Sequence, residues 1–177
     1  LYSTNDAYTP SELEAKQQLK EVLLNTDNHK NAIFVTTFSS QIARIKAISD
    51  IAAKMDRKVV FLGRSLSKYL KAARDADVID FKSSKIIKYR NKIKKFLKTL
   101  SKPYKYIFIA TGHQGEPKAT LSRIVDEGYF KLQSTDKIIF SCQIIPVEQN
   151  YEARAVLEKK IKDGGAQIYT DINYSGQ

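Results

Sequence analysis

The amino-acid sequence predicts a three-layer α/β fold in which helices cover both faces of a mostly parallel, five-stranded sheet. Short apolar runs of strand character alternate along the chain with segments whose apolar residues recur at helical spacing. Three of the runs end abruptly in turns that contain Gly, Ser or Thr, as the strands of such sheets often do. With 177 residues, of which 42% are hydrophobic, the chain has the size and composition of one globular domain.

The five expected strands are the most apolar short runs of the chain. Each is rich in β-branched or aromatic residues and is bounded by polar residues or glycine. The expected strands cover residues 32–36, 58–62, 105–110, 137–141 and 166–169. A weaker apolar pair, Val78-Ile79, is a candidate short strand inside a connector over residues 75–81.

Helical spacing between these runs predicts the covering helices. Thr9, Pro10 and Glu12 together form a helix-start signal with a capping box, and that helix is expected to end near Leu24. Further helices are expected over 42–55, 66–76, 86–100, from 119 onward and over 151–162. In the last helix, four side chains are expected to face the core: Ala153, Val156, Leu157 and Ile161.

Positive charge is concentrated in one segment. The formal net charge is +11, and no acidic residue lies between Asp80 and Glu116. Ten cations occupy that interval: Lys82, Lys85, Lys88, Arg90, Lys92, Lys94, Lys95, Lys98, Lys102 and Lys105. Such a block attracts polyanions, although the exposed face of an ordinary lysine-rich helix is the alternative.

Within this block, we expect an exposed basic surface formed by Lys85, Lys88, Arg90, Lys92 and Lys95. Contacts of these side chains with phosphates would carry no sequence readout. The block also contains an aromatic residue. Tyr89 is expected to lie half-buried beside the core, with stacking on a nucleic-acid base as the alternative.

Cysteine and histidine are scarce, which limits the chemistry available to the chain. The single cysteine, Cys142, excludes an internal disulfide and fits a reducing, cytoplasmic setting. With His29 and His113 as the only histidines, no metal site within this chain is expected. No signal peptide and no apolar run near the roughly 18 residues of a membrane span are recognised, so a membrane partner is not expected.

The most specific motif is Thr-Gly-His-Gln-Gly-Glu-Pro at 111–117, followed by Leu-Ser-Arg-Ile at 121–124. It joins an expected strand to an expected helix, where backbone N–H groups and two glycines can approach an anion. A tight connection without a ligand is the alternative. The motif resembles the TGxQGEP…LSRI signature of the β-CASP domain of ribonuclease J, in particular the archaeal type.

Three further segments carry the same resemblance, which therefore extends over nearly the whole chain. They are VTTFSSQIARI at 35–45, LGRSLSKY at 62–69 and TPSE at 9–12. The resemblance implies a Rossmann-like β-CASP domain with its core at 9–170. Residues 1–5 and 171–177 would then be junctions to a metallo-β-lactamase domain that is absent from this chain.

The family resemblance also implies a function. In the family the two domains form a zinc-dependent 5′-to-3′ exoribonuclease of mRNA decay and RNA processing, with RNA held between the domains. Zinc is thus implied for the parent enzyme, and a homodimer of the parent is left open. No catalytic residue is assigned to this chain, which is expected to be inactive alone.

The residues expected to contact RNA phosphate stand at the strand exits and in the last motif. They are Thr37, Ser39, Ser40, Arg64, Ser65, Thr111, Gly112, His113, Gln114, Gly115, Ser141, Ser175 and Gly176. For the first three, simple capping of the following helix is the alternative. His113 is expected to contribute a loop hydrogen bond, with a catalytic base as the alternative. Glu116 is expected to accept from backbone N–H groups or from Arg123, with proton transfer as the alternative.

The chain departs from the family pattern in the loop at 141–150, where the Gly-Asn part of P-x-P-G-N-E is lost or shifted, and at three positions near its ends. Tyr2 replaces an acidic residue, and Asn173 and Gln177 replace the two histidines of D-x-H-V-S-G-H. Since neither amide shuttles protons, the replacements indicate either an inactive relative or altered ends. An inactive relative that serves as a protein-interaction module is one alternative function. A Rossmann-like nucleotide-binding domain is another, although no G-x-G-x-x-G occurs.

Overall fold

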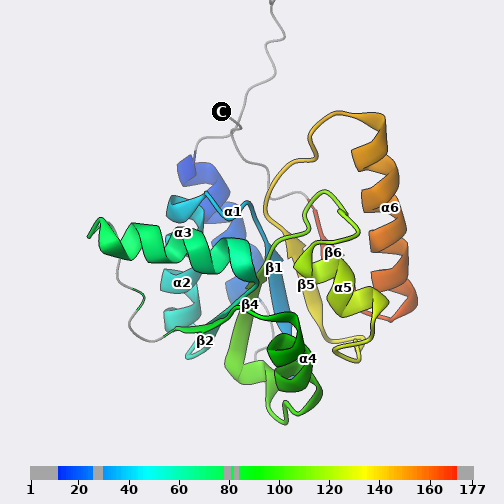
Figure 1. Cartoon of the computed structure of the whole chain (residues 1–177), viewed down its shortest axis with the longest axis horizontal. Helices are drawn as coiled ribbons and strands as arrows, with labels where there is room; N and C mark the ends of the chain where they lie inside the picture. Colours follow the sequence, from blue (N-terminus) through cyan, green and yellow to red (C-terminus); the bar gives the residue numbers. More distant parts are fainter. Residues whose placement is uncertain (1–11, 26–29, 78–80, 82–83, 171–177) are drawn as a thin grey trace, which may run out of the picture.

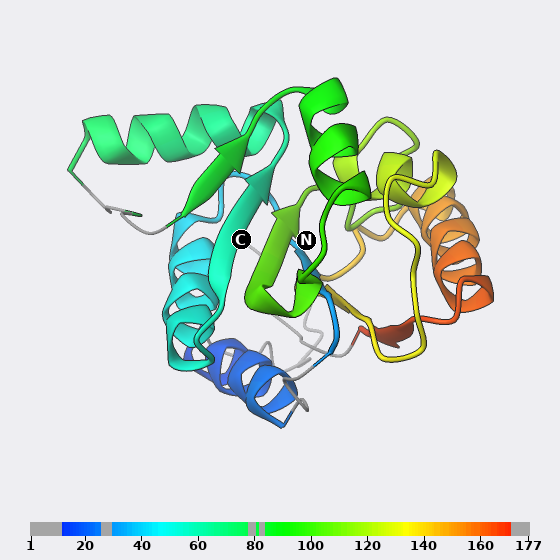
Figure 2. The same cartoon turned by 90° about the horizontal axis from the view of Figure 1, so that it is seen from below.

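A computed structural model describes residues 12–25, 30–77, 81 and 84–170 of the chain. Within them, one fully parallel sheet runs through the molecule in the strand order β3-β2-β4-β1-β5-β6 (Figures 1 and 2). The predicted α/β class and the helical cover on both faces are confirmed. We predicted five strands, and the sheet has six in the described part of the chain.

The strands are short and mostly buried, as the apolar runs predict. They are β1 (Ile33–Thr36), β2 (Lys58–Leu62), β3 (Lys85–Ile87), β4 (Tyr106–Ala110), β5 (Lys137–Phe140) and β6 (Gln167–Tyr169). In β1, all four residues are buried. A strand that is buried on both faces has no polar alternation, which explains why these runs read as continuous apolar stretches.

The strand missed in the sequence is β3. We expected one helix over 86–100, but Ile86 and Ile87 pair in parallel with Phe61 and Leu62 of β2. The helix begins later and covers Arg90–Lys98 only. Two consecutive β-branched residues favour an extended backbone, and β2 at the edge of the sheet supplies backbone groups with which they can pair. The seven-residue spacing from Ile86 to Ile93, which fits a helix, does not exclude a strand that precedes one.

The helices follow the predicted order. They are α1 (Glu12–Leu24), α2 (Ile42–Lys54), α3 (Arg64–Asp75), α4 (Arg90–Lys98), α5 (Thr120–Asp126) and α6 (Glu148–Asp163), with a 3-10 turn, η1, at Pro103–Lys105. Helix α6 begins earlier than expected. One of its predicted inward residues is wrong: Val156 is 55% exposed, whereas Arg154 is buried.

Two apolar cores fill the space between the sheet and its helices. Helices α1, α2 and α3 pack on one face, where Ile45 and Leu66 meet Val35 and Phe61. Helices α4, α5 and α6 cover the other face, as Figure 1 shows. The alternation of side chains along each strand divides them between the two cores.

All strand exits lie at one edge of the sheet because every pair of neighbouring strands is parallel. We call this the carboxyl edge. Neighbouring exits leave toward opposite faces: β2 leads into α3, whereas β3 and β4 on either side of it lead into α4 and α5. Such divergence opens crevices at which α/β proteins bind ligands.

Several expectations lie outside the described residues. These are the helix start at Thr9 and Pro10, the candidate strand at Val78-Ile79, Lys82, and the terminal positions Tyr2, Asn173, Ser175, Gly176 and Gln177. The two expected junctions to another domain therefore stay predictions. Within the described residues, no helix has the length and apolarity needed to cross a membrane.

Candidate nucleic-acid interface

A pocket of about 300 Å³ opens at the carboxyl edge, where the exits of β2, β3 and β4 meet. Five cationic residues line it: Arg64 after β2, Lys88 and Arg90 after β3, and Lys118 and Arg123 after β4. We call it the basic pocket. The remaining lining residues are Gly63, Ser65, Ile93, Thr111, Ala119, Thr120 and Tyr129. None of these lining residues is acidic, so the charge of the pocket is strongly positive.

The close approach of two exits shapes the pocket. Gly63 has a φ of 118°, a conformation that side chains rarely adopt, and a Cβ atom there would lie 2.7 Å from Thr120 Oγ1. The N–H of Gly63 also donates to the carbonyl of Ile87, at 3.0 Å. Glycine therefore lets the exit of β2 turn between the exits of β3 and β4.

One of the five cations is fixed by neighbours. Arg90 donates through Nε to the hydroxyl of Tyr129 at 2.8 Å and pairs with Glu127. The Tyr129 hydroxyl in turn donates to Glu127 at 2.9 Å, which completes a triangle. Hydrogen bonds with Glu127 and Tyr129 raise the pKa of Arg90, so its charge is permanent and its position defined.

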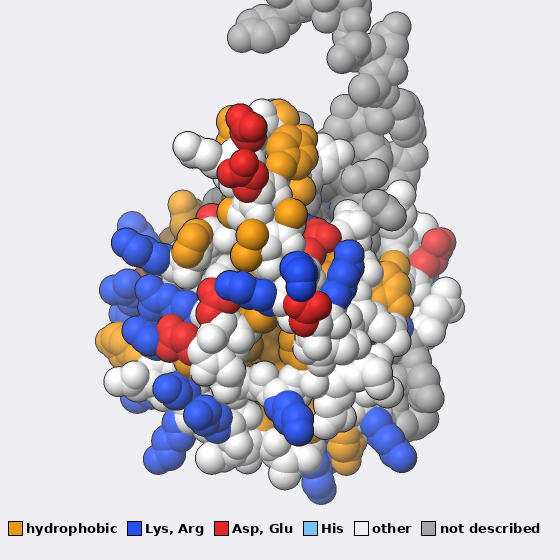
Figure 3. Space-filling view, turned by 90° about the vertical axis from the view of Figure 1, so that its right-hand side faces the viewer, with side chains coloured by type: hydrophobic (Ala, Val, Ile, Leu, Met, Phe, Trp, Pro, Cys, Tyr) orange, Lys and Arg blue, Asp and Glu red, His pale blue; other side chains and the backbone are white. Residues whose placement is uncertain are grey.

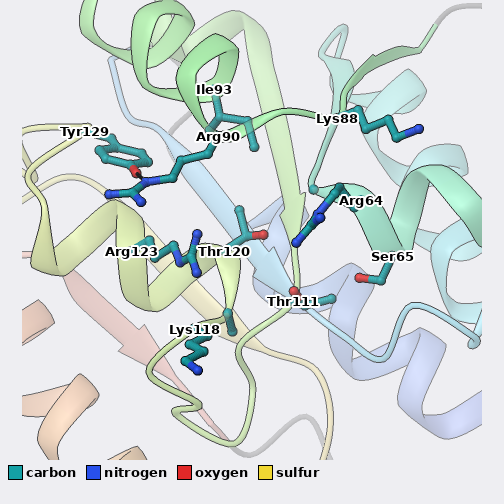
Figure 4. A pocket seen from close by; sticks show the side chains of 12 residues that line it. Arg64, Ser65, Lys88, Arg90, Ile93, Thr111, Lys118, Thr120, Arg123 and Tyr129 are labelled. Atoms are coloured by element: carbon teal, nitrogen blue, oxygen red, sulfur yellow. Dashed lines mark hydrogen bonds between the residues drawn. The ribbon is translucent and has the colours of Figure 1, made fainter.

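The other four cations differ from Arg90. None of the described acidic side chains forms an ion pair with Arg64, Lys88, Lys118 or Arg123. In Figure 4, Arg64 and Arg123 extend from opposite walls toward Thr120 at the centre, whereas Lys88 points outward. Two guanidinium groups that face one space suit a group with several anionic oxygens, such as a phosphate.

The turn at 111–117 links the basic pocket to the interior. Its first residue, Thr111, lines the pocket, and its carbonyl accepts the N–H of Leu121 at 3.0 Å. Its middle residues, Gly112 to Gly115, are buried instead. Glu116 accepts the backbone N–H of Gln114 at 3.1 Å, which confirms the expectation that this carboxylate binds backbone.

His113 is buried and packs against an aromatic ring. Its side chain is 3% exposed, and its ring centroid lies 3.8 Å from that of Phe38. Neither ring nitrogen has a hydrogen-bond partner among the described residues, so the expected loop hydrogen bond of this side chain is not found. Burial and the charge of Arg154 lower the pKa of His113 to about 4, so the ring is neutral at pH 7.

Gln114 and Arg154 hold the turn from two sides. The Gln114 amide donates to the carbonyl of Gln143 at 3.2 Å and accepts the N–H of Ile145 at 2.9 Å. Arg154 of α6 donates to the carbonyl of His113 at 2.5 Å and lies 3.2 Å from the centroid of the Phe140 ring. Burial lowers the pKa of Arg154 to about 10, so it stays charged at neutral pH.

The exits of β1 and β5 form a buried polar cluster. The Thr37 hydroxyl donates to the side-chain oxygen of Gln41 at 3.1 Å, and the Cys142 thiol donates to the same oxygen at 3.1 Å. The Ser141 hydroxyl donates to the carbonyl of Thr36 at 2.6 Å. These side chains satisfy one another inside the protein, and contact with phosphate by Thr37 or Ser141 stays a prediction.

The structure thus separates the sequence-predicted residues into groups. The basic pocket gathers Arg64, Ser65 and Thr111 with Lys88 and Arg90. The buried group comprises Thr37, Gly112, His113, Gln114, Gly115 and Ser141. Ser39 and Ser40 form the turn before α2, and Ser175 and Gly176 lie outside the described residues. Two pocket cations, Lys118 and Arg123, were not predicted as phosphate ligands. Their position in the sequence could have indicated this role, since both follow the same strand exit as Thr111.

Outside the pocket, the basic surface continues along α4. Lys92 and Lys95 are exposed on this helix, and Lys85 is exposed on the edge strand β3 with its Nζ 4.4 Å from the Phe96 ring centroid. Figure 3 shows Lys and Arg side chains gathered along one margin of the face it displays. The expected exposure of Lys85, Lys92 and Lys95 is confirmed.

An apolar groove of about 830 Å³ lies beside the exits of β1 and β5. Its apolar lining includes Phe38, Ile42, Ile144, Ile145 and Pro146, and Ser40 also lines it. Among the described residues, no three His, Cys, Asp or Glu side chains come together as ligands for a metal ion. The donor set of a catalytic zinc site is therefore not found in the described part of this chain.

Comparison with known proteins identifies the family of this chain. Residues 30–158 match the family described as "Ribonuclease J, beta-CASP domain". The ribonuclease J of Methanocaldococcus jannaschii is 41% identical over 97% of this chain, and that of Pyrococcus abyssi is 36% identical over 95%. The chain spans 39% and 38% of the lengths of these two relatives. The chain therefore belongs to the β-CASP domain family of ribonuclease J.

Proposed function

We propose that this chain is the RNA-gripping lobe of a ribonuclease-J-type nuclease. The observation that supports it most directly is the basic pocket, which five cations from three strand exits line without a lining acid. A phosphodiester backbone offers the negative oxygens that such a site requires. The relatives, which are named ribonuclease J, make RNA the polyanion to test first.

The proposed grip is electrostatic and does not read sequence. Arg64, Lys118 and Arg123 have no ion-pair partner among the described residues, so no internal pair must be broken before they bind phosphate. The exposed lysines of α4 extend the positive potential beyond the pocket. Cations of this kind displace counterions from a nucleic acid, which makes the affinity strongly dependent on salt.

In this proposal, hydrolysis is carried out elsewhere in the parent protein. A metallo-β-lactamase part would hold zinc and supply the activated water for 5′-to-3′ cleavage in the cytoplasm. The described residues of this chain supply no such ligand set, and its buried His113 is neutral and faces Phe38. The chain alone is therefore expected to bind RNA and not to cut it.

The first test is RNA binding as a function of salt concentration. Replacing both Arg64 and Arg123 by alanine is expected to reduce the slope of log affinity against log salt by about 1.4, because each lost single-strand phosphate contact accounts for about 0.7. The control is the Lys54→Ala/Lys58→Ala double variant. It removes equal charge at the opposite edge of the sheet, where α2 ends and β2 begins. Equal slopes for the two double variants would contradict the proposed grip.

The second test addresses catalysis by the isolated chain. Labelled RNA is incubated with purified chain and added zinc, and the products are separated by size. Uncut RNA is the expected result. Sustained, metal-dependent cleavage by the chain would show that a catalytic centre lies within these 177 residues.

A protein-interaction module is the second candidate, and the apolar groove favours it. Ile145 is 49% exposed there and lines the groove together with Phe38, Ile42, Ile144 and Pro146. A contiguous exposed apolar patch of this kind is typical of a protein-interaction site. Such a module would show RNA affinity with little dependence on salt. The salt series above therefore separates the two candidates.

A further inference from the structure

The most exposed tyrosine of the basic region stands at the rim of the basic pocket. Tyr89 is 55% exposed, which corrects the expectation of a half-buried position beside the core. Its two neighbours in sequence, Lys88 and Arg90, both line the pocket. The Nζ of Lys88, which points outward from the pocket, lies 5.4 Å from the centroid of the Tyr89 ring, so the ring lies on the outer side of the pocket lining.

The backbone of Tyr89 is fixed at the start of α4. Its φ and ψ of −101° and 137° are those of an extended residue that precedes a helix, and its carbonyl accepts the N–H of Ile93 at 2.9 Å. Ile93 in turn is buried in the core beneath α4. The position of the Tyr89 backbone is thus fixed, and only two side-chain torsions are left to order when a ligand binds.

Lysines surround the ring. Besides Lys88, the Nζ of Lys92 lies 5.9 Å from its centroid. An aromatic ring that is exposed among cations, beside a pocket for phosphate, has the two components that proteins use to bind single-stranded nucleic acids. These are a positively charged track for the backbone and an aromatic face for the bases.

We propose that Tyr89 is a stacking platform for one base of a single-stranded RNA whose neighbouring phosphate occupies the basic pocket. This inference rests on the proposed function, since it specifies how the lobe holds its RNA. It assigns a binding role to a residue outside the family motifs at 35–45, 62–69 and 111–124. Because every base has a π face, the platform holds any sequence.

The test compares three variants of the full protein in RNA binding by fluorescence anisotropy, with EDTA present to suppress metal-dependent cleavage. Tyr89→Leu keeps apolar bulk but removes the ring, and Tyr89→Phe keeps the ring. Tyr69→Leu is the matched control, because Tyr69 is a 43% exposed tyrosine on α3 that does not line the pocket. We expect at least about fivefold weaker binding for Tyr89→Leu alone, with wild-type affinity for the other two.

A second measurement separates stacking from charge. The salt slope of Tyr89→Leu should equal that of wild type, because no cation is removed, whereas Lys88→Ala should lower it by about 0.7. RNA that carries 2-aminopurine at one position should show fluorescence quenching on wild type and on Tyr89→Phe, and less on Tyr89→Leu.

Three outcomes would overturn the inference. If wild type binds RNA and Tyr89→Leu binds equally well, the stacking platform is wrong and the proposed function stands. If Tyr89→Phe is as weak as Tyr89→Leu, the hydroxyl and not the ring makes the contact. If wild type shows no salt-dependent RNA binding, the proposed function itself is wrong, and the platform with it.

Discussion

Two sides of the carboxyl edge use the same strand-exit geometry in opposite ways. At the exits of β2, β3 and β4, charged side chains face solvent, and four of the five lining cations have no ion-pair partner among the described residues. At the exits of β1 and β5, polar side chains are buried and bond to one another or to backbone. One side therefore has cations available for an external anion, as the proposed function requires, and on the other side the polar groups hold the interior together.

The turn at 111–117 belongs to both sides and shows why they differ. Thr111 lines the basic pocket, but His113 and Gln114 are directed into the protein, where they are 3% and 4% exposed. Burying an unpaired polar group costs more than leaving it in water. The Gln114 amide has partners there, whereas neither ring nitrogen of His113 has one among the described residues. Substitutions on the interior side should therefore change stability, and substitutions in the basic pocket should change binding.

The largest effect is expected at Gly115. Its φ is 78°, and a Cβ atom there would lie 2.4 Å from the backbone carbon and oxygen of Ala153 in α6. Gly115→Ala must displace either the turn or the helix, so we expect a loss of about 4 kcal/mol or more in the free energy of unfolding. Urea unfolding followed by circular dichroism measures it.

Gly128 provides the matched control for Gly115. Its φ is also positive, at 58°, but nothing lies within 4 Å of a Cβ atom placed there. Gly128→Ala should therefore cost only the left-handed backbone strain, about 1 to 2 kcal/mol. Equal losses for the two variants would show that α6 does not restrain the turn.

The next effect is a dependence of stability on pH that His113 causes. Burial and Arg154 lower its pKa to about 4, whereas the unfolded chain has a value near 6.5. Between these two values the unfolded state binds a proton that the folded state does not. Stability therefore falls as pH decreases from about 6.5 toward 4, by about 2 kcal/mol at pH 5.

The His113→Phe variant isolates this contribution. Phenylalanine keeps an aromatic ring against Phe38 but does not titrate, and the backbone carbonyl that accepts from Arg154 remains. The difference in unfolding free energy between pH 7 and pH 5 should be smaller in the variant by about 2 kcal/mol. An unchanged difference would mean that the imidazole can reach solvent and protonate without unfolding.

An effect of similar size is expected for the Gln114 side chain, which joins the turn to the segment after β5. Gln114→Ala removes its bonds to the Gln143 carbonyl and the Ile145 N–H, and about 2 kcal/mol of stability should be lost. In contrast, Gln143→Ala removes an exposed side chain and leaves that carbonyl in place. Its loss should stay below about 0.5 kcal/mol, and limited proteolysis near residue 145 should increase only in the Gln114 variant.

Five of the six strands could be predicted from the sequence, because parallel strands buried on both faces produce short, continuous apolar runs. The edge strand β3 could not. Three residues at a sheet edge add little to an apolar signal, and the register that accepts Ile86 and Ile87 exists only once β2 has folded beside them. The start of α4 was misplaced for the same reason.

Only some of the residues that line the basic pocket could be predicted from the sequence. Arg64, Ser65 and Thr111 were found because each stands directly after a strand, where exits gather. Arg123 lies on the helix after the turn, and its convergence with Arg64 depends on how α5 packs against the sheet. The burial of Arg154 could not be predicted from the sequence, because a charged residue interrupts the apolar pattern of α6. Arg154 is buried because it donates to the carbonyl of His113 in the turn.

The smallest effect on the fold should come from the pocket itself. Lys118 is exposed, lines the basic pocket and has no ion-pair partner among the described residues, so Lys118→Ala should change the unfolding free energy by less than about 0.5 kcal/mol. RNA affinity at moderate salt should nevertheless fall about threefold, because one phosphate contact is lost. Lys105 is the control, since this exposed lysine precedes β4 at the opposite edge whereas Lys118 follows β4. A cation that faces solvent without a partner among the described residues should contribute to RNA binding and not to the stability of the fold. If Lys118→Ala instead destabilised the fold and bound RNA as well as Lys105→Ala does, the pocket side of the carboxyl edge would serve rigidity, as the interior side does.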